Sequence, residues 1–185
     1  KPIWFKDFAQ QWLQDYAAGA VKPLTLRSYR AQLRLHLVPT FGDLGVADIT
    51  AQAVQGFLGR CIREKSLSAK TTNNLLTILK EMLRHAKKWG YLSENPAEEI
   101  EPLRVEQREM GYLQPHEIHL FLKHADEPYR TLFMTAIMTG MRRGELLGLQ
   151  WGDIDLNTNI IRVQRSLYWQ RKEEQAEQHL GGKEL

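Results

Sequence analysis

The sequence predicts a mainly α-helical protein with two domains, a four-helix bundle followed by the beginning of an α+β domain. Apolar residues recur at helical spacing in four segments before residue 90. A polar and acidic stretch with Pro102 and Gly111 then interrupts this pattern. Beyond it, further helical segments precede a strand-like run at 160–163. We therefore expect a first domain at residues 1–97, a linker at 98–111 and a second domain at 112–185.

The first two helices are expected at residues 3–18 and 24–38. The first carries an aromatic stripe, which we interpret as core packing rather than as a platform for stacking bases. The second has an apolar face beside a basic one, and Pro39 is expected to end it. The aromatic stripe includes Phe5, Phe8, Trp12 and Tyr16, and the basic face includes Arg27, Arg30 and Arg34.

The third and fourth helices are expected at residues 51–64 and 69–88, with Thr50 or Asp48 capping the third and Ser68 capping the fourth. The fourth helix has two stripes on opposite sides. The apolar stripe predicts core packing, and the polar, basic stripe is about 20 Å long at a rise of ~1.5 Å per residue. That stripe comprises Asn73, Thr77, Lys80, Arg84 and Lys87. It is suited to a run of phosphates, and the alternative is a solvated helix face.

The second domain is expected to begin with a helix from Pro115 to about Ala125. A helix at 128–138 follows, and because it is apolar on most sides we expect it to be buried. Asn157-Thr158-Asn159 predicts a hairpin turn before the strand at 160–163. Three histidines, His116, His119 and His124, lack the spacing that would place them on one helix face, so we expect no metal site there.

Residues 139–155, TGMRRGELLGLQWGDID, form the most informative stretch. After Thr139-Gly140 a short helix is expected from about Arg142 to Leu149. Arg142 and Glu145 are three residues apart and so neighbours on that helix. A cation in the first turn opposes the helix dipole, and an anion such as phosphate would relieve the conflict. The alternative is an ordinary buried helix with a structural Arg–Glu pair.

Charge is distributed unevenly along the chain. The net charge is +3, but residues 1–90 hold 14 Lys/Arg against 6 Asp/Glu, and residues 91–185 hold 11 against 16. The basic half suggests a polyanionic partner, although an uneven solvated surface would look the same. The single Cys61 excludes an intrachain disulfide. No run approaches the ~20 apolar residues of a membrane span, so we expect a cytoplasmic protein without membrane contact.

The box at 139–155 resembles the first catalytic box of the tyrosine recombinases, the phage-integrase family, which reads Thr-Gly-x-Arg-x-x-Glu-Leu/Ile and then Leu-x-Trp-x-Asp-Ile/Val. Earlier segments resemble the SAM-like core-binding domain of that family: Thr25 to Tyr29, Pro39 to Gly42, and Gly90 to Pro96. The resemblance implies that the first domain binds DNA and that residues 112–185 are the first part of a catalytic domain.

The resemblance also implies a chemistry. In this family a tyrosine attacks a DNA phosphodiester, forming a 3′-phosphotyrosine link without any cofactor or metal. Arg142 occupies the position of the first catalytic arginine, and Glu145 the position of its acidic support. Double-stranded DNA would be the partner, and the full-length protein would act as a synaptic tetramer. The DNA-contacting residues are then expected to be Arg27, Arg30, Arg34, Lys70, Thr72, Asn73, Thr77, Lys80, Arg84 and Lys87.

Other parts of the family pattern have no counterpart in the sequence. It contains no His-x-x-Arg box, and Tyr168 falls where a strand is expected rather than in a nucleophile motif. Lys172 and Lys183 are candidates for the hairpin lysine of the family. We therefore expect a fragment that binds DNA but does not cleave it. The alternatives are a non-catalytic DNA-binding regulator and a helical protein-interaction module in which Arg142 is structural.

Overall fold

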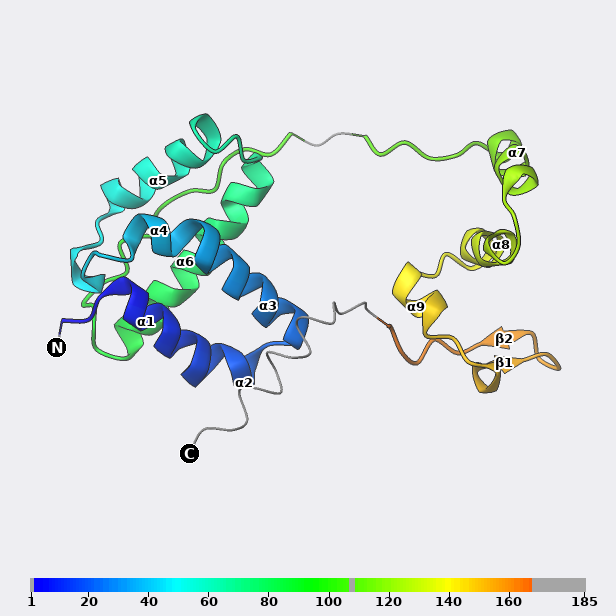
Figure 1. Ribbon diagram of the computed structural model, residues 1–185, viewed down its shortest axis with the longest axis horizontal. Coiled ribbons are helices and arrows are strands. Elements are labelled where there is room, and N and C mark those ends of the chain that lie inside the picture. The colour runs from blue at the N-terminus through cyan, green and yellow to red at the C-terminus, as the bar shows by residue number, and fades with distance from the viewer. Residues whose placement is uncertain (1, 107–108, 168–185) are drawn as a thin grey trace. The chain divides into compact units, whose positions relative to one another are not determined.

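The computed structural model describes residues 2–106 and 109–167 and divides the chain into two compact units (Figure 1). Unit 1 is Lys1–Arg108 and unit 2 is Glu109–Leu185. The division falls inside the range 98–111 that the sequence marks as a linker. The fold is mainly helical, with one small antiparallel sheet, as predicted. Within the described residues no helix is long and apolar enough to cross a membrane.

Unit 1 begins with one continuous helical run made of α1 (Phe5–Trp12), a π-helical turn (Leu13–Ala17) and α2 (Ala18–Ala20). Its aromatic stripe is directed into the core, where Phe5, Phe8 and Trp12 are fully buried. The interpretation of this stripe as core packing is confirmed.

The second helical run comprises α3 (Pro23–Gln32), a π-helical turn (Leu33–Leu37) and α4 (Val38–Phe41). The prediction that Pro39 ends this helix is wrong. Proline lacks an N–H, but the wider turn before it lets the Val38 N–H donate to the Leu33 carbonyl. The Thr40 hydroxyl donates to the His36 carbonyl at 2.9 Å, which gives that carbonyl a partner. The helix therefore continues past the proline for a further half-turn.

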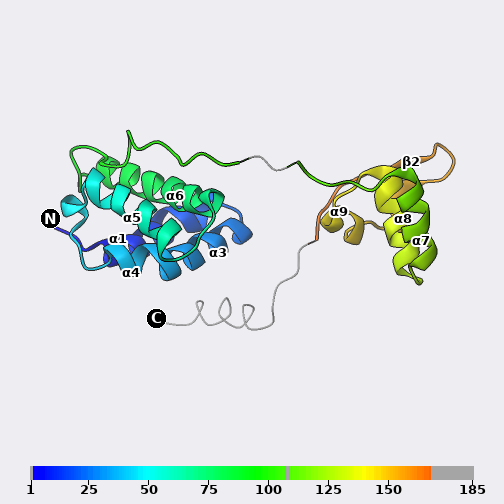
Figure 2. The same cartoon turned by 90° about the horizontal axis from the view of Figure 1, so that it is seen from above.

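A short 3₁₀ turn (Val46–Asp48) leads into α5 (Ala51–Arg63), and α6 (Ala69–Lys88) follows. Both predicted caps are confirmed: Thr50 Oγ1 accepts from the Ala53 N–H at 3.1 Å, and Ser68 Oγ accepts from the Thr71 N–H at 3.1 Å. The two helices pack against each other (Figure 2). The apolar faces of both helices are buried, namely Val54, Phe57, Leu58 and Cys61 on α5 and Leu75, Leu79, Met82, Leu83 and Ala86 on α6.

The chain then reverses at Gly90 (φ +82°) and returns along α6. Ala97 and Ile100 join the core with exposures of 0% and 8%. The Asn73 side chain of α6 both donates to the Leu103 carbonyl and accepts from the Leu103 N–H, each at 2.8 Å. Residues 95–103, which we call the return segment, are therefore part of unit 1, although the sequence places most of them in the linker.

Unit 2 contains α7 (Pro115–His124), α8 (Tyr129–Thr139), α9 (Arg143–Leu147) and a hairpin of β1 (Ile154–Asp155) and β2 (Ile160–Ile161). The strands pair antiparallel with Ile154 opposite Ile161. The predicted hairpin turn is confirmed, since Asn159 has φ +55° and Asp155 Oδ1 accepts from the Asn157 N–H at 3.0 Å. The second strand is shorter than predicted because the chain leaves the ladder after Ile161 and runs toward α9.

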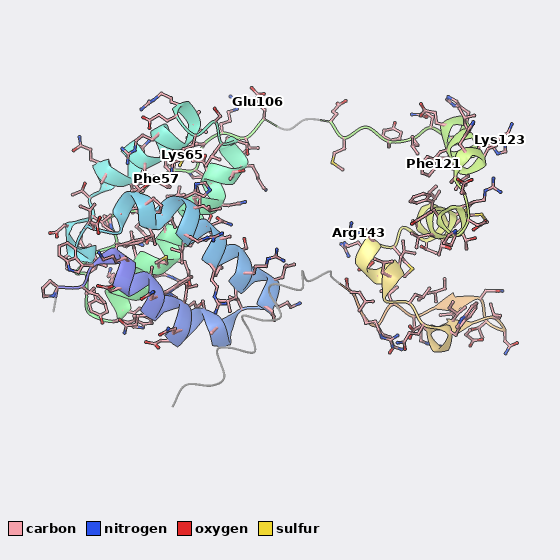
Figure 3. The ribbon with its side chains drawn as sticks, viewed as in Figure 1. Phe57, Lys65, Glu106, Phe121, Lys123 and Arg143 are labelled. Atoms are coloured by element: carbon pink, nitrogen blue, oxygen red, sulfur yellow. The ribbon has the colours of Figure 1, made fainter. Side chains whose placement is uncertain are left out.

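The prediction that the helix at 128–138 is buried is wrong. No residue of α7, α8 or α9 is buried, and Met138 is 72% exposed. The apolar contact that α8 does make is with α7, where the Phe121 and Phe133 ring centroids are 5.1 Å apart. Figure 3 shows Phe121 on α7 in this contact region. Leu132, Ala136 and Ile137 of α8 are half-buried, whereas Met134 and Met138 are exposed.

Candidate functional site

Residues 139–155, which we call the arginine box, begin at the junction of α8 and α9. Gly140 adopts a left-handed conformation (φ +67°) that ends α8, and its N–H donates to the Ala136 carbonyl at 2.8 Å. Thr139 Oγ1 donates to the Thr135 carbonyl at 2.6 Å and accepts from the Met141 N–H at 3.3 Å. These contacts turn the chain so that Arg142 becomes the N-cap residue of α9, with an extended backbone. Arg142 therefore precedes the helix rather than occupying its first turn.

Glu145 holds Arg142 from two sides. One carboxylate oxygen accepts from the Arg142 backbone N–H at 2.8 Å, and the other accepts from the Arg142 guanidinium at 3.1 Å. The backbone hydrogen bond, followed by the guanidinium, holds the pKa of Glu145 below its ordinary value. Glu145 thus supplies the N3 half of a capping box, its contact with the N-cap backbone N–H, and adds an ion pair to the N-cap side chain. Arginine carries no acceptor, so the other half of the box is absent at Arg142.

The free side of the arginine faces solvent. The Arg142 side chain is 87% exposed, whereas that of Glu145 is 21% exposed. Glu145 engages one guanidinium nitrogen, so the rest of the planar donor fork remains open to a phosphate oxygen. The neighbouring Arg143, to which we assign no chemistry, points away from α9 (Figure 3).

The segment after the hairpin packs against α9. The Leu167 N–H donates to the Gly144 carbonyl at 2.8 Å, and a Cβ at Gly144 would lie 2.6 Å from the Leu167 carbonyl oxygen. Close by, Arg165 forms a bidentate ion pair with Asp153, at 2.7 and 3.2 Å. Asp153 ends a 3₁₀ turn (Trp151–Asp153) and is buried, with an exposure of 4%.

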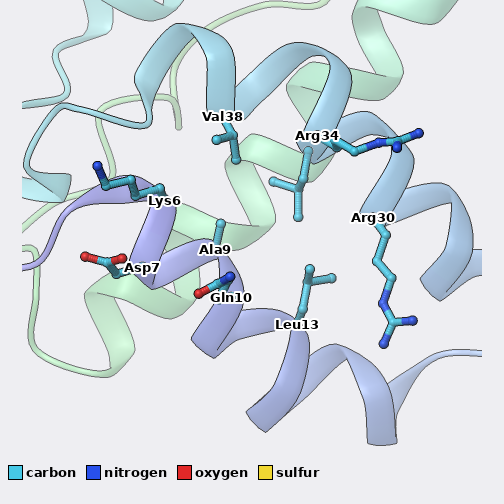
Figure 4. Close-up of a pocket in the computed structure, with 9 residues that line it drawn as sticks. Lys6, Asp7, Ala9, Gln10, Leu13, Arg30, Arg34 and Val38 are labelled. Carbon is cyan, nitrogen blue, oxygen red and sulfur yellow. The ribbon is translucent and has the colours of Figure 1, made fainter. Parts of the chain in front are cut away.

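Basic residues of α3 and the following π-turn lie beside a groove in unit 1. The groove has a volume of about 340 Å³ and separates α1 from the second helical run (Figure 4). Arg30, Arg34 and Lys6 contribute cations to its edge, and Ala9, Leu13, Leu33 and Val38 contribute apolar atoms. Lys6 is paired with Asp43 at 2.9 Å. The side chains of Arg27, Arg30 and Arg34 are exposed, as an interface with DNA requires.

The predicted DNA contacts on α6 have different environments. Lys70, Thr77, Arg84 and Lys87 are exposed. Asn73 and Lys80 are half-buried, and both bind the return segment, since the Lys80 ammonium donates to the Glu98 carbonyl at 2.9 Å. One guanidinium nitrogen of Arg84 donates to both carboxylate oxygens of Glu81, at 2.5 and 2.6 Å. A phosphate would have to compete with that carboxylate.

The prediction that Thr72 contacts DNA is wrong. Its side chain is fully buried and its hydroxyl has no hydrogen-bond partner in the described structure. Thr72 lies on the core side of α6, one residue before Asn73, so it cannot reach a duplex in this conformation. We therefore remove it from the candidate interface.

The sequence did not indicate the ion pair between Asp153 and Arg165. The two residues are twelve positions apart, and neither helical nor strand periodicity connects them. The asymmetry of the pair, a buried carboxylate with a partly exposed arginine, depends on how the hairpin folds back. Among the described residues no three potential ligands form a metal-binding group. Tyr168, Lys172 and Lys183 lie outside the described residues.

Comparison with known proteins identifies the class of this chain. The model described as "Phage integrase, N-terminal SAM-like domain" matches residues 4–60, and that described as "Phage integrase family" matches residues 111–182. The chain therefore belongs to the phage integrase family of tyrosine recombinases. The two matched regions lie in units 1 and 2, and the second contains the Arg142 box.

One curated relative agrees with this assignment, and two solved structures share the fold. A "Tyrosine recombinase XerC-like" protein of Caldanaerobacter subterraneus is 30% identical over 170 residues, which cover 87% of this chain and 43% of the relative. The Tn1549 transposon integrase, solved with circular intermediate DNA, has a TM-score of 0.76 at 22% identity and covers 89% of this chain and 55% of that one. A lambda integrase tetramer bound to a Holliday junction has a TM-score of 0.72 at 21% identity, covering 83% and 46%. The chain spans less than half the length of the curated relatives it matches.

Proposed function

We propose that this chain is the DNA-binding and arginine-bearing part of a site-specific DNA recombinase. In the full-length protein, strands would be broken and rejoined through a 3′-phosphotyrosine intermediate. Unit 1 would bind duplex DNA through the basic residues of α3 and α6. Unit 2 would bring Arg142 to the scissile phosphate. The family match and the exposed cations of the two units support this function.

The observation that carries the proposal is the state of Arg142. Its guanidinium is exposed and fixed at one nitrogen by Glu145, and its backbone is fixed by the same carboxylate. A preorganised, partly unsatisfied donor fork suits the charge that develops on the oxygens of a phosphoryl group in the transition state. Removal of one such donor commonly raises the barrier by ~3–4 kcal/mol. Glu145 orients Arg142 in this scheme and does not contact DNA.

Assembly and strand cleavage belong to the full-length protein. The lambda integrase relative assembles as a tetramer on a Holliday junction, and we propose a tetrameric synaptic complex here as well. The chain alone is proposed to bind DNA without cleaving it, because its sequence contains no His-x-x-Arg box. Covalent attachment of this chain to a labelled suicide substrate would contradict that statement.

The test is duplex binding against salt concentration. We expect affinity to fall steeply with salt, because cations that contact phosphates displace condensed counterions. Two double charge reversals probe the two helices, R30E/R34E for the second helical run and K70E/K87E for α6. Each is expected to weaken binding at least tenfold and to reduce the salt slope by about 2, as loss of two phosphate contacts requires.

The matched control reverses two exposed cations, Arg63 at the end of α5 and Lys65 just after it. The variant R63E/K65E changes the net charge by the same amount. Because these residues lie outside the proposed interface, affinity is expected to stay within about threefold of the wild type. An equal loss in the control would assign the effect to net charge alone. If the chain binds no duplex more tightly than ~10⁻⁴ M at low salt, the proposal that it binds DNA is wrong.

A further inference from the structure

The helix that presents Arg142 is too short to be stable by itself. α9 contains five residues, none of them buried, whereas isolated helices below ~12–15 residues are marginal in water. Its position must therefore be imposed by its neighbours. α8 reaches it through the turn at Gly140, and the segment after the hairpin reaches it from the other side, where the Leu167 N–H donates to the Gly144 carbonyl at 2.8 Å.

An ion pair between Arg165 and Asp153 anchors that segment. Arg165 donates to both carboxylate oxygens of Asp153, at 2.7 and 3.2 Å, and makes a longer contact of 3.4 Å with the Gly148 carbonyl just after α9. Asp153 also accepts from the Gln150 N–H at 2.9 Å, and its own carbonyl accepts from the Arg162 N–H at 2.9 Å. The pair thus joins the end of α9, the 3₁₀ turn and the segment that leaves β2.

The close approach is built into the sequence at two glycines. A Cβ at Gly144 would meet Ser166 and Leu167, and one at Gly148 would lie 3.1 Å from Arg165 Cγ. By contrast, a Cβ at Gly152, within the neighbouring 3₁₀ turn, would meet nothing within 4 Å. The absence of side chains at Gly144 and Gly148 lets the Arg165 segment lie directly against α9.

We propose that Asp153 and Arg165 are positioning residues that hold α9, and so Arg142, in the orientation that meets a DNA phosphate. This inference rests on the proposed function and extends it to two residues that contact no phosphate themselves. A bidentate Arg–carboxylate pair suits this role because its planar geometry fixes orientation as well as distance. Replacement of either partner removes the bidentate contact, so the segment is expected to shift.

The test is a double-mutant cycle on DNA affinity, measured with the whole chain and a mixed-sequence duplex. The four proteins are wild type, R142A, D153N and R142A/D153N. D153N is chosen because the two explanations predict opposite changes in DNA affinity. Removal of a negative charge would raise the affinity for a polyanion by simple electrostatics, whereas loss of the positioning of Arg142 lowers it. D155N is the matched control, since it removes a carboxylate two residues along the chain while keeping the oxygen that accepts from the Asn157 and Thr158 N–H groups.

We expect R142A and D153N each to weaken binding and to reduce the salt slope by about 1, the value for one phosphate contact. The double variant should bind no more weakly than either single variant. D153N is expected to act through the phosphate contact of Arg142, and R142A has already removed that contact. D155N should bind as well as the wild type or slightly better. Hydrogen exchange at the Leu167 amide should accelerate in D153N and stay unchanged in D155N.

Each other outcome has a distinct meaning. If D153N binds as well as D155N, or if its loss adds fully to that of R142A, the positioning role is overturned. If R142A binds like the wild type, the proposed function of Arg142 fails first. If D153N unfolds unit 2, R165K replaces it in the test, because a lysine keeps the charge but cannot make the bidentate contact. A smaller salt slope of DNA affinity in folded R165K supports the proposal, and an unchanged salt slope overturns it.

Discussion

Single residues decide whether the arginine box can work, and Arg142 with Glu145 shows how. Their spacing of three residues predicts that they are neighbours, and the structure places them in contact at 3.1 Å. The spacing does not predict that Glu145 also binds the Arg142 backbone N–H. That second contact arises because Arg142 is the residue before α9 and not its first turn. One carboxylate therefore both starts the helix and orients the cation.

This double role predicts a pH dependence at one amide. The pKa of Glu145 is held below its ordinary 4.5 by the Arg142 N–H and then by its guanidinium. A depressed pKa means that the contact is complete above pH 4.5 and is lost as pH falls through the lowered value. The Arg142 amide resonance should therefore titrate below pH 4.5 in a ¹H–¹⁵N spectrum. In E145Q it should not titrate there, and an identical titration in E145Q would refute the assignment.

At the same scale, sequence reasoning fails where a side chain's direction depends on packing. The basic stripe of α6 was predicted from spacing, and most of its members are exposed. Thr72, added to the interface on the family resemblance, is buried instead. Asn73 and Lys80 bind the return segment, whose path no periodicity encodes. The partner of Arg84 is Glu81, one turn away on the same helix.

Elements were the most predictable level of the structure. The bounds of α6 match the prediction, and the caps Thr50 and Ser68 are confirmed, because capping is local chemistry. The second helix continues past Pro39 because a π-turn before the proline changes the hydrogen-bond pattern. α8 is apolar on most sides and yet exposed, because burial depends on which other elements are present to cover it.

The contact between α9 and the segment after β2 allows a test at the level of elements. In Gly144→Ala the new methyl group would lie 2.6 Å from the Leu167 carbonyl oxygen, so backbone must move. We expect a destabilisation of about 1–3 kcal/mol, typical of overpacking. Gly152→Ala is the control, with nothing within 4 Å of the added methyl group, and a change within about 0.5 kcal/mol is expected. Urea unfolding of unit 2 measures both, and equal effects would contradict the close packing.

For the whole molecule, the sequence predicts two domains joined by a linker at 98–111, and the structure divides the chain into two compact units between residues 108 and 109. The sequence does not predict that part of the apparent linker belongs to unit 1. The polar and acidic composition of that range suits a solvated tether. However, Ala97 and Ile100 are buried, and one asparagine amide holds the backbone at Leu103. The tether that joins the units therefore starts after Leu103.

Asn73 and Asn74 provide a matched pair for testing this anchor. Asn73→Ala removes both hydrogen bonds to Leu103, each worth about 0.5–1.5 kcal/mol. Exchange of the Leu103 amide should therefore accelerate about 10- to 100-fold, because ~1.4 kcal/mol corresponds to a factor of ten. A glutamate-specific protease should also begin to cut after Glu98 and Glu99. Asn74→Ala, on the exposed side of the same helix turn, should leave both measurements unchanged. If the two variants behave alike, the return segment is held by Ala97 and Ile100 in the core and not by Asn73, and the tether starts at Ile100 instead.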